Sequence, residues 1–347
     1  MTLSTFVTDV VQWQQQHGRH HLPWQHTTDP YRIWLSEIML QQTQVTTVLS
    51  YYARFLERFP TIDALAQATQ EQVMPYWAGL GYYARARNLH RCAQAVVNDH
   101  HGHFPTTSQE LATLPGIGPS TAAAIAAFAY GERAPIMDGN VKRVFSRYFG
   151  IYGLTHLRAT EKQLWAKAHE VLASAPKNIN MAAYTQGQMD LGAQICTRNK
   201  PQCPQCPLAK GCFAYAHQTQ AELPTPKPTK RSPQRYAQLL IWQQAGQVLV
   251  EQRPNTGIWG GLISLPQFDD SAAMHSFMRQ QGLAINQLQA LPVINHIFSH
   301  FKLQLQPWLY TSSTALRESQ PHQHWLAMDQ LQQAALPAPI YTLLSHL

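Results

Sequence analysis

The sequence predicts a two-domain chain, in which an all-α region is followed by a small α+β domain. Its 347 residues are enough for about two domains. Apolar residues recur at helical spacing through the first region, whereas the last part has the texture of strands. A proline-rich, basic stretch, HQTQAELPTPKPTKRSPQ, favours an extended linker between them. We therefore place the all-α region at 1–216, the linker at 217–234 and the α+β domain at 235–347.

In the all-α region, each expected helix has a local signal. Phe6 and Val10 indicate a first amphipathic helix. Asp29 and Pro30, a cap and a first-turn proline, begin either one long helix or two abutting helices that stop at Pro60. Further helical patterns cover residues 62–68, 82–99, 119–130, 140–149, 159–173 and 179–195.

The α+β domain carries paired strand signals. Strands are expected at 236–243 and 247–252, on either side of Ala245-Gly246, which is a hairpin signal. Two more strands are expected at 293–298 and 301–310, and helices at 270–281 and 327–335.

Charge and composition limit the classes of function. The formal net charge is +7 and the pI is about 9.2, which suits a polyanionic partner. No apolar run approaches the roughly 20 residues of a membrane span, and the amino terminus lacks a secretory pattern. Since the chain has five cysteines but no such signal, we expect a cytoplasmic protein in a reducing compartment, with no membrane partner.

Four of the cysteines stand in one proline-punctuated loop. Cys196, Cys203, Cys206 and Cys212 have the spacing C-x6-C-x2-C-x5-C. The short step from Cys203 to Cys206 is unfavourable for a disulfide, so the loop predicts a thiolate cage for a metal or a cluster. Zinc takes the same four-thiolate set. The long first spacing favours an iron–sulfur cluster without deciding between the two.

The segment LPGIGPS, residues 114–120, predicts a turn between two helices. Gly116 and Gly118 permit a tight turn with positive φ, and Pro119 suits the first position of the next helix. Such a turn aims backbone N–H groups outward at a helix amino terminus, where a phosphate can bind. An ordinary helical corner is the alternative. A phosphate contact of this kind reads a nucleic-acid backbone and not its sequence.

Two carboxylates are candidates for chemistry. Asp138 precedes the helix expected at 140–149, so it should cap that helix, whose amino terminus should lower its pKa. Glu37 lies in the apolar segment WLSEIML. It is either a surface residue on a polar stripe or a buried acid with a raised pKa.

These motifs together resemble a known family. The cysteine spacing resembles the [4Fe–4S] loop of the endonuclease III superfamily of DNA glycosylases. The turn followed by Pro135 and Asp138 resembles the helix–hairpin–helix–Gly/Pro–Asp motif of those enzymes, and WLSEIMLQQTQV resembles the adenine-specific MutY family. The resemblance spans essentially the whole chain. It implies a helix–hairpin–helix body with a [4Fe–4S] cofactor, made of a helical barrel at about 23–133 and a cluster subdomain from 1–22 and 134–216.

The resemblance also implies roles for site residues. Glu37 would be the catalytic acid and Asp138 the second catalytic carboxylate. Ser120 stands where lyases of the superfamily carry a lysine, which implies a monofunctional glycosylase, and Lys142 would support the pocket or contact a phosphate. The residues matching Gln42 and Tyr82 wedge into the duplex while the target base is flipped out. The DNA-contacting residues expected are Gln41, Gln42, Leu80, Tyr82, Gly116, Gly118 and Arg143.

The second domain resembles the Nudix fold of 8-oxo-dGTP hydrolases through GIWGGL and Leu265-Pro266. A Nudix hydrolase needs a glutamate-rich helix for Mg²⁺, and the segment DSAAMHSFMRQQG has no glutamate, so metal-dependent hydrolysis is not expected. Residues 296–301 resemble the family loop that senses 8-oxoguanine, and a hairpin turn with aromatic packing is the alternative. Phe298, Ser299 and His300 are the lesion-recognition residues so implied.

The function implied is removal of adenine from mispairs with 8-oxoguanine or guanine in duplex DNA, by a monomeric base excision repair enzyme associated with the nucleoid. A bifunctional apurinic/apyrimidinic lyase of the endonuclease III type is an alternative, which Ser120 and the second domain disfavour. The second domain also disfavours a mismatch thymine glycosylase. A non-catalytic damage-binding module is a further alternative, which Glu37 and Asp138 disfavour.

Overall fold

The computed structural model describes residues 3–228, 232–312 and 322–347. Residues 229–231 of the expected linker therefore lie outside the described residues. The chain divides into two compact units. The first unit is Met1–Gln67 with Asn88–Pro228, and the second is Ala68–Arg87 with Thr229–Leu347.

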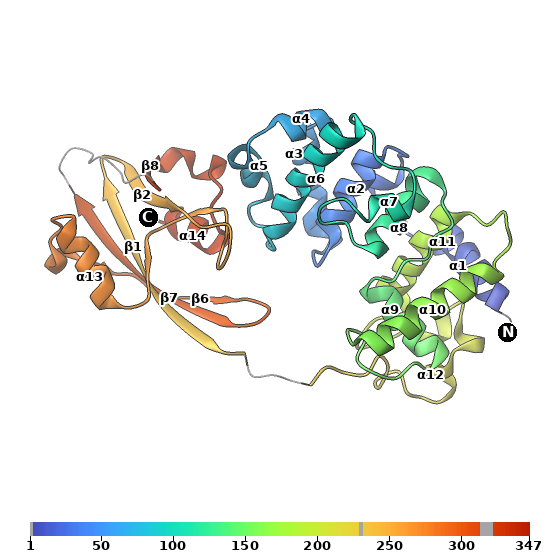
Figure 1. Ribbon diagram of the computed structural model, residues 1–347. Helices are drawn as coiled ribbons and strands as arrows, with labels where there is room; N and C mark the ends of the chain where they lie inside the picture. The colour runs from blue at the N-terminus through green and yellow to red at the C-terminus, as the bar shows by residue number, and fades with distance from the viewer. Residues whose placement is uncertain (1–2, 229–231, 313–321) are drawn as a thin grey trace. The chain divides into compact units, whose positions relative to one another are not determined.

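The first unit is helical, and in residues 3–228 the structure forms no strand, which confirms the all-α prediction (Figure 1). Most helix boundaries fall within two residues of those expected, because caps and prolines mark them in the sequence. The helices of residues 3–228 are α1 (Leu3–His17), α2 (Pro30–Leu40), α3 (Val45–Arg58), α4 (Ile62–Gln67), α5 (Gln70–Trp77), α6 (Ala84–His100), α7 (Ser108–Leu111), α8 (Pro119–Tyr130), α9 (Gly139–Phe149), α10 (Arg158–Ser174), α11 (Met181–Asp190) and α12 (Phe213–Ala216), of which α5 and the start of α6 belong to the second unit.

The helical pattern after Asp29 forms two helices and not one. Asp29 caps α2 by accepting a hydrogen bond from the N–H of Tyr31 at 2.9 Å. After Leu40 the chain turns, and Gln42 takes a left-handed conformation with φ of 59° before α3 begins. This turn exposes Gln42 between the two helices.

The helix expected to run to residue 195 changes character at Asp190. α11 ends there, and Leu191–Ile195 continues as one π-helical turn. Residue 192 must be glycine for this turn to lie where it does, because a Cβ atom there would come within 2.5 Å of Cβ of Asn140. The glycine thus lets the π turn approach the first turn of α9.

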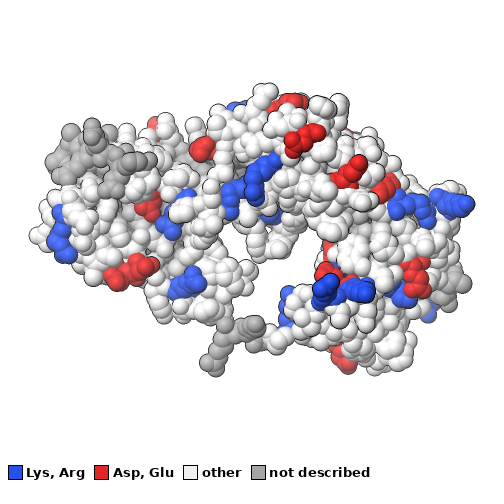
Figure 2. All heavy atoms as spheres, viewed as in Figure 1, with Lys and Arg blue, Asp and Glu red and all other residues white. Residues whose placement is uncertain are grey.

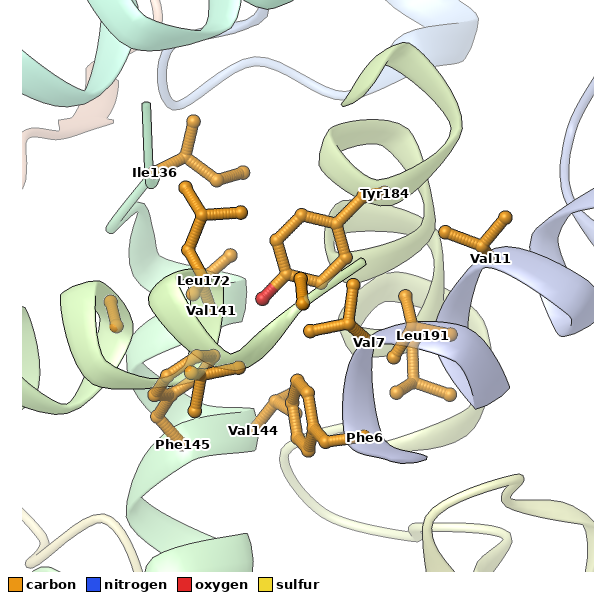
Figure 3. Packing of buried hydrophobic residues seen from close by; sticks show 14 of the residues in the cluster. Phe6, Val7, Val11, Ile136, Val141, Val144, Phe145, Leu172, Tyr184 and Leu191 are labelled. Atoms are coloured by element: carbon orange, nitrogen blue, oxygen red, sulfur yellow. The ribbon is translucent and has the colours of Figure 1, made fainter. Parts of the chain in front are cut away.

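A hydrophobic core fixes α9 against α1 and α11 (Figure 3). Val141, Val144 and Phe145 face inward from α9, and the ring of Phe6 meets that of Phe145 edge-on at 5.4 Å. Tyr184 of α11 is 1% exposed in the same core. Since apolar side chains anchor α9 on this side, its amino terminus is held in a fixed place.

The second unit contains a mixed β-sheet, and its α+β character is as expected. The strands are β1 (Gln234–Gln244), β2 (Gln247–Gln252), β3 (Ile263–Ser264), β4 (Gln267–Phe268), β5 (Gln289–Ala290), β6 (Ile294–Ile297), β7 (Lys302–Ser312) and β8 (Gln323–Ala327). The main order is β3-β2-β1-β7-β5, in which β4 also pairs with β1, β6 with β7 and β8 with β2. Long parallel pairing of β1 with β7 runs from Gln234↔Lys302 to Gln244↔Ser312 (Figure 1).

Two hairpins of this sheet follow the sequence signals. β1 and β2 are joined by Ala245 and Gly246, with φ of 48° and 73°, the backbone that a two-residue hairpin of matching twist requires. β6 and β7 are antiparallel, and the N–H of Phe298 donates to the carbonyl of Phe301 across the tip at 2.9 Å.

The helices of this unit match the expectation in part. α13 (Ser271–Gln280) forms as expected, whereas the segment expected at 327–335 is a 3-10 helix, Met328–Gln333. A further helix, α14 (Ala338–Leu344), was not predicted. In the part of the chain that the structure describes, none of the helices has the length and apolar character needed to cross a bilayer.

Candidate active site

A cavity of about 950 Å³ opens in the first unit, where the carboxyl end of α2 meets the amino ends of α8 and α9. Glu37, Ser120 and Asp138 all line it. The two carboxylates, far apart in the sequence, therefore converge on one space. The wall contains further polar side chains, namely Arg19, Gln41, Gln42, Thr43, Gln44, Thr46, Thr121, Asn140, Arg143 and Gln186.

Glu37 is half-buried and corresponds to the second alternative that the sequence left open, an acid with a raised pKa. It sits on α2 among the buried residues Trp34 and Ile38. Burial, and then the negative charge of Asp138, raise its pKa from 4.5 to about 8. Glu37 is therefore mostly protonated at neutral pH.

Asp138 caps α9, as its position in the sequence predicted. Its Oδ1 accepts from the N–H of Val141 at 2.7 Å, and the amide of Asn140 donates to Oδ2 at 3.5 Å. Burial raises the pKa of Asp138 by more than these hydrogen bonds and the positive charge of Arg143 lower it, so the net shift is upward. The expectation that the helix terminus would lower the pKa of Asp138 is wrong in direction, because desolvation of the carboxylate is the larger effect.

The two carboxylates nevertheless differ in which protonation state their surroundings stabilise. The ionised form of Asp138 receives two hydrogen bonds and faces a guanidinium, whereas the causes acting on Glu37, burial and the charge of Asp138, both favour its neutral form. When the two share one proton, Glu37 holds it. A neutral acid beside an ionised carboxylate is the arrangement that N-glycosidic bond cleavage needs.

Ser120 and Lys142, both expected to support the pocket, are placed differently. The hydroxyl of Ser120 lines the cavity and accepts from the N–H of Met137 at 2.9 Å, which ties α8 to the segment before Asp138. Lys142 is not among the lining residues. Its ammonium pairs with Glu161 at 2.6 Å, because the helical turn points it away from the face of α9 that carries Asp138.

The predicted hairpin forms between α7 and α8. Gly116 has φ of 79°, and a Cβ atom there would lie 2.7 Å from Cβ of Asn88, so glycine is required twice over. Gly118 does not need positive φ. It is the extended N-cap of α8, with φ of −86°, and nothing lies within 4 Å of a Cβ built there. Both glycines are exposed, so the first N–H groups of α8 are accessible to a phosphate.

The two predicted wedge residues share an unusual backbone. Gln42 and Tyr82 have φ of 59° and 50°, a conformation that costs non-glycine residues energy and that recurs at functional sites. Both side chains are exposed, Tyr82 by 48%. Leu80 differs from the expectation, since it is only 6% exposed and presents almost no surface to DNA. Gln41 lines the cavity and donates to the hydroxyl of Thr121 at 3.3 Å.

Charge alone does not outline a DNA path on the face shown in Figure 2. There the basic and acidic side chains are interspersed, and most of the surface is uncharged.

Some cavity residues were missed by the sequence reasoning. Asn140 bridges Asp138 and Arg143 through its side-chain amide, and its place in the first turn of α9 was an available signal. Arg19 and Gln186 had none, since tertiary packing brings them here. Both are held by the carboxylate of Asp190, to which Arg19 pairs at 2.6 Å and Gln186 donates at 2.9 Å.

Arg143 links this cavity to the cysteine loop. Its guanidinium donates to Asn140 at 2.8 Å, to the carbonyl of Gly192 at 2.6 Å and to that of Cys196 at 2.7 Å. Its nitrogens are therefore engaged by the protein, although it lines the cavity.

The four cysteines of the loop are unpaired thiols gathered in one region. Burial, followed by the charges of Cys196, Cys212 and Cys203, raises the pKa of Cys206, so the four side chains lie close enough to interact. Within residues 3–228, 232–312 and 322–347, however, no three or more histidine, cysteine or acidic side chains are arranged to hold a metal ion.

The residues expected to sense the lesion form the tip of the β6–β7 hairpin in the second unit. The rings of Phe298 and Phe301 stack at 4.5 Å, and Phe298 lies 4.5 Å from His296. Ser299 and His300 are exposed, and the Ser299 hydroxyl lies 3.2 Å from Nδ1 of His300. The hairpin turn with aromatic packing, which was the alternative to a sensing loop, is therefore present. Ser299 and His300 are exposed at its tip.

Comparisons with known proteins identify the family of this chain. Residues 35–170 match the HhH-GPD superfamily of base excision DNA repair proteins, and residues 237–346 match the NUDIX domain. An adenine DNA glycosylase of Buchnera aphidicola subsp. Baizongia pistaciae is 34% identical over 349 residues, covering 100% of this chain and 98% of that protein. The adenine DNA glycosylase of Homo sapiens is 32% identical, covering 96% of this chain and 72% of that protein.

Solved structures are similar to the helical part. A thermostable thymine-DNA glycosylase aligns with a TM-score of 0.55 and 30% identity, over 62% of this chain and 97% of that one. Endonuclease III in a non-covalent DNA complex has a TM-score of 0.52 at 19% identity, over 63% of this chain and 99% of that one, and shows the fold alone. The chain therefore belongs to the adenine DNA glycosylase family, base excision repair enzymes of the HhH-GPD superfamily that hydrolyse N-glycosyl bonds.

Proposed function

We propose that this glycosylase removes adenine mispaired with 8-oxoguanine or guanine in duplex DNA, and that it does so without cutting the strand. The observation that carries the proposal is the pair in the cavity, a protonated Glu37 beside Asp138. Glu37 donates its proton to the flipped adenine, which makes the base a better leaving group. Asp138 stabilises the positive charge that develops on the sugar as the bond breaks, and it assists water to add to the sugar, either directly or after a transient covalent adduct with Asp138.

The other predicted contacts complete the substrate complex. The hairpin at Gly116 and Gly118 holds a backbone phosphate. Gln42 and Tyr82 fill the gap that the flipped nucleotide leaves in the stack, since unstacking a base costs a few kcal/mol. Phe298, Ser299 and His300 recognise the base opposite the adenine. Ser120 supplies no amine for a Schiff base, which supports a monofunctional reaction.

The cysteine loop holds a [4Fe–4S] cluster in this proposal. The donor set is four thiols in one loop, which fits such a cluster. Zinc takes the same four-thiolate set, and the long C-x6-C spacing favours the cluster. When bound, the cluster supplies structure to a DNA-contacting loop.

We further propose that the enzyme acts as a monomer, on DNA of the cytoplasmic nucleoid. The α13 segment, with neither glutamate nor aspartate within Ser271–Gln280, supports a recognition role for the second unit in place of metal-dependent hydrolysis.

Excision assays on A:8-oxoguanine, A:G, A:T and T:G duplexes, run in parallel, test this proposal. We expect adenine release from the first two and strand breaks only after treatment with base. Prompt strand scission would instead support the lyase, and thymine release from T:G would support the mismatch thymine enzyme.

A further inference from the structure

Arg147 of α9 is a buried arginine that the excision chemistry does not use. It is 3% exposed and does not line the cavity. All three guanidinium nitrogens donate to backbone carbonyls, and one also donates to a sulfur. Nε donates to Gln220 O (3.2 Å) and Leu223 O (2.8 Å), Nη1 to Thr197 O (2.7 Å), Cys196 O (3.4 Å) and Cys196 Sγ (3.3 Å), and Nη2 to Arg198 O (3.0 Å).

These contacts close the cysteine loop at both ends. Cys196 opens the loop, and Gln220 and Leu223 follow its last cysteine, so one side chain joins segments on either side of it. The thiol of Cys212 in turn donates to the carbonyl of Arg147 at 3.6 Å. The first and last cysteines thus both contact this one residue.

The charge of Arg147 has no acidic partner in the described part of the chain, where every ion pair joins other residues. Burying a guanidinium on neutral carbonyls alone is costly, because their dipoles replace only part of its hydration. Among its contacts, Cys196 Sγ is the atom that becomes anionic when it binds a metal. The site is therefore arranged to receive negative charge beside Arg147.

We propose that Arg147 is a positioning residue for the cluster. It holds Cys196 and both ends of the loop, donates an N–H···S hydrogen bond to the bound Cys196 thiolate, and balances the net negative charge of the thiolate-ligated cluster. The inference rests on the proposed [4Fe–4S] cofactor. Since a hydrogen bond to sulfur and a nearby positive charge both stabilise the more negative, reduced state, Arg147 raises the reduction potential.

The test uses the full chain with Arg147→Lys and Arg147→Met, after iron and sulfide analysis of the wild type. Arg133→Met is the matched control, because its guanidinium also donates to backbone carbonyls, those of Leu172 and Pro176, and not to the cysteine loop. Two quantities are measured, the reduction potential by film voltammetry and the rate of iron release to a chelator. We expect Arg147→Met to show a lower potential and about tenfold faster release, the effect of losing one charge-assisted hydrogen bond. Arg147→Lys keeps the charge, so we expect faster release with a smaller fall in potential. Arg133→Met should match the wild type in both.

The possible results distinguish a failure of the role of Arg147 from a failure of the proposed [4Fe–4S] cofactor. Wild-type protein without iron and sulfide rejects the cofactor, and the inference with it. A loaded wild type whose Arg147 variants keep its potential overturns the role of Arg147 and leaves the cofactor in place. If Arg147→Met does not fold, Arg147→Lys decides, because lysine keeps the charge but one nitrogen cannot span these carbonyls. Wild-type iron release in that variant also overturns the inference.

Discussion

Replacing Glu37 by glutamine should abolish fast excision and, at the same time, stabilise the protein above neutral pH. Glutamine has nearly the same shape but no proton to give. Loss of a general acid slows a reaction by about 10²- to 10⁴-fold. In the wild type, the excision rate should fall about tenfold per pH unit above the pKa of about 8, as Glu37 loses its proton, and should fall again in acid, where Asp138 becomes protonated.

The stability effect follows from the same pKa. The folded-state pKa of Glu37 is raised from 4.5 to about 8, so the folded protein binds the proton more tightly than the unfolded chain. Wild-type stability therefore falls as pH rises from about 4.5 to 8, at about 1.4 kcal/mol per pKa unit. The loss is under about 1 kcal/mol at pH 5 and reaches at most about 3.4 kcal/mol at pH 7, an upper value because Glu37 borders an open cavity. The Glu37→Gln variant does not lose this stability, because glutamine does not titrate.

Two assays check the reasoning on one set of proteins. Single-turnover excision gives the rate, and thermal unfolding at pH 5 and pH 8 gives the stability. Glu57→Gln, the same change on an exposed position of α3, is the control and should alter neither. The hypothesis of a buried neutral acid fails if Glu37→Gln excises adenine at the wild-type rate. It fails equally if the variant gains no more stability at pH 8 than at pH 5.

Three further predictions concern the hairpin between α7 and α8, the tip of the β6–β7 hairpin, and Lys142 of α9. Gly116→Ala should cost more than about 1 kcal/mol and weaken duplex binding, because of its positive φ and the contact with Asn88, whereas Gly118→Ala should leave stability unchanged; equal unfolding midpoints would contradict this. Ser299→Ala should reduce the preference for 8-oxoguanine over guanine opposite adenine without changing stability, since Ser299 is exposed, and unchanged selectivity in paired excision assays would reject the sensing role. Lys142→Gln should leave adenine excision intact and cost at most about 1 kcal/mol, the worth of its partly exposed pair with Glu161; a large fall in single-turnover rate would return Lys142 to the active site.

The first unit was predictable wherever a helix end has a local chemical cause. α8 begins at Pro119 and ends at Tyr130, as expected, because a first-turn proline and a left-handed Gly131 bound it. The break between α2 and α3 stayed open, since apolar spacing continues through Gln42 and nothing local forces the turn. The 3-10 helix at Met328–Gln333 and the helix at Ala338–Leu344 also depend on packing, which a periodicity does not record.

The candidate site likewise combines features that have a local cause with features that depend on packing. The sequence identifies Asp138 as a helix cap, because capping is a property of neighbouring residues, and it groups the four cysteines in one loop. It could not give the pKa of either carboxylate. The helix terminus predicted a lowered value for Asp138, and burial, which only the assembled fold creates, reversed the direction.

By itself, then, the amino-acid sequence determined those helices and hairpins whose ends carry a local signal, and which residue types can do chemistry, since caps, turns and periodicity act over a few residues. Only the tertiary structure decided that Glu37 and Asp138 share one cavity, that Arg19 joins them and that Lys142 does not. Those relations depend on how α2, α8, α9 and α11 pack, and desolvation and Coulomb interactions arise only once distant segments lie together.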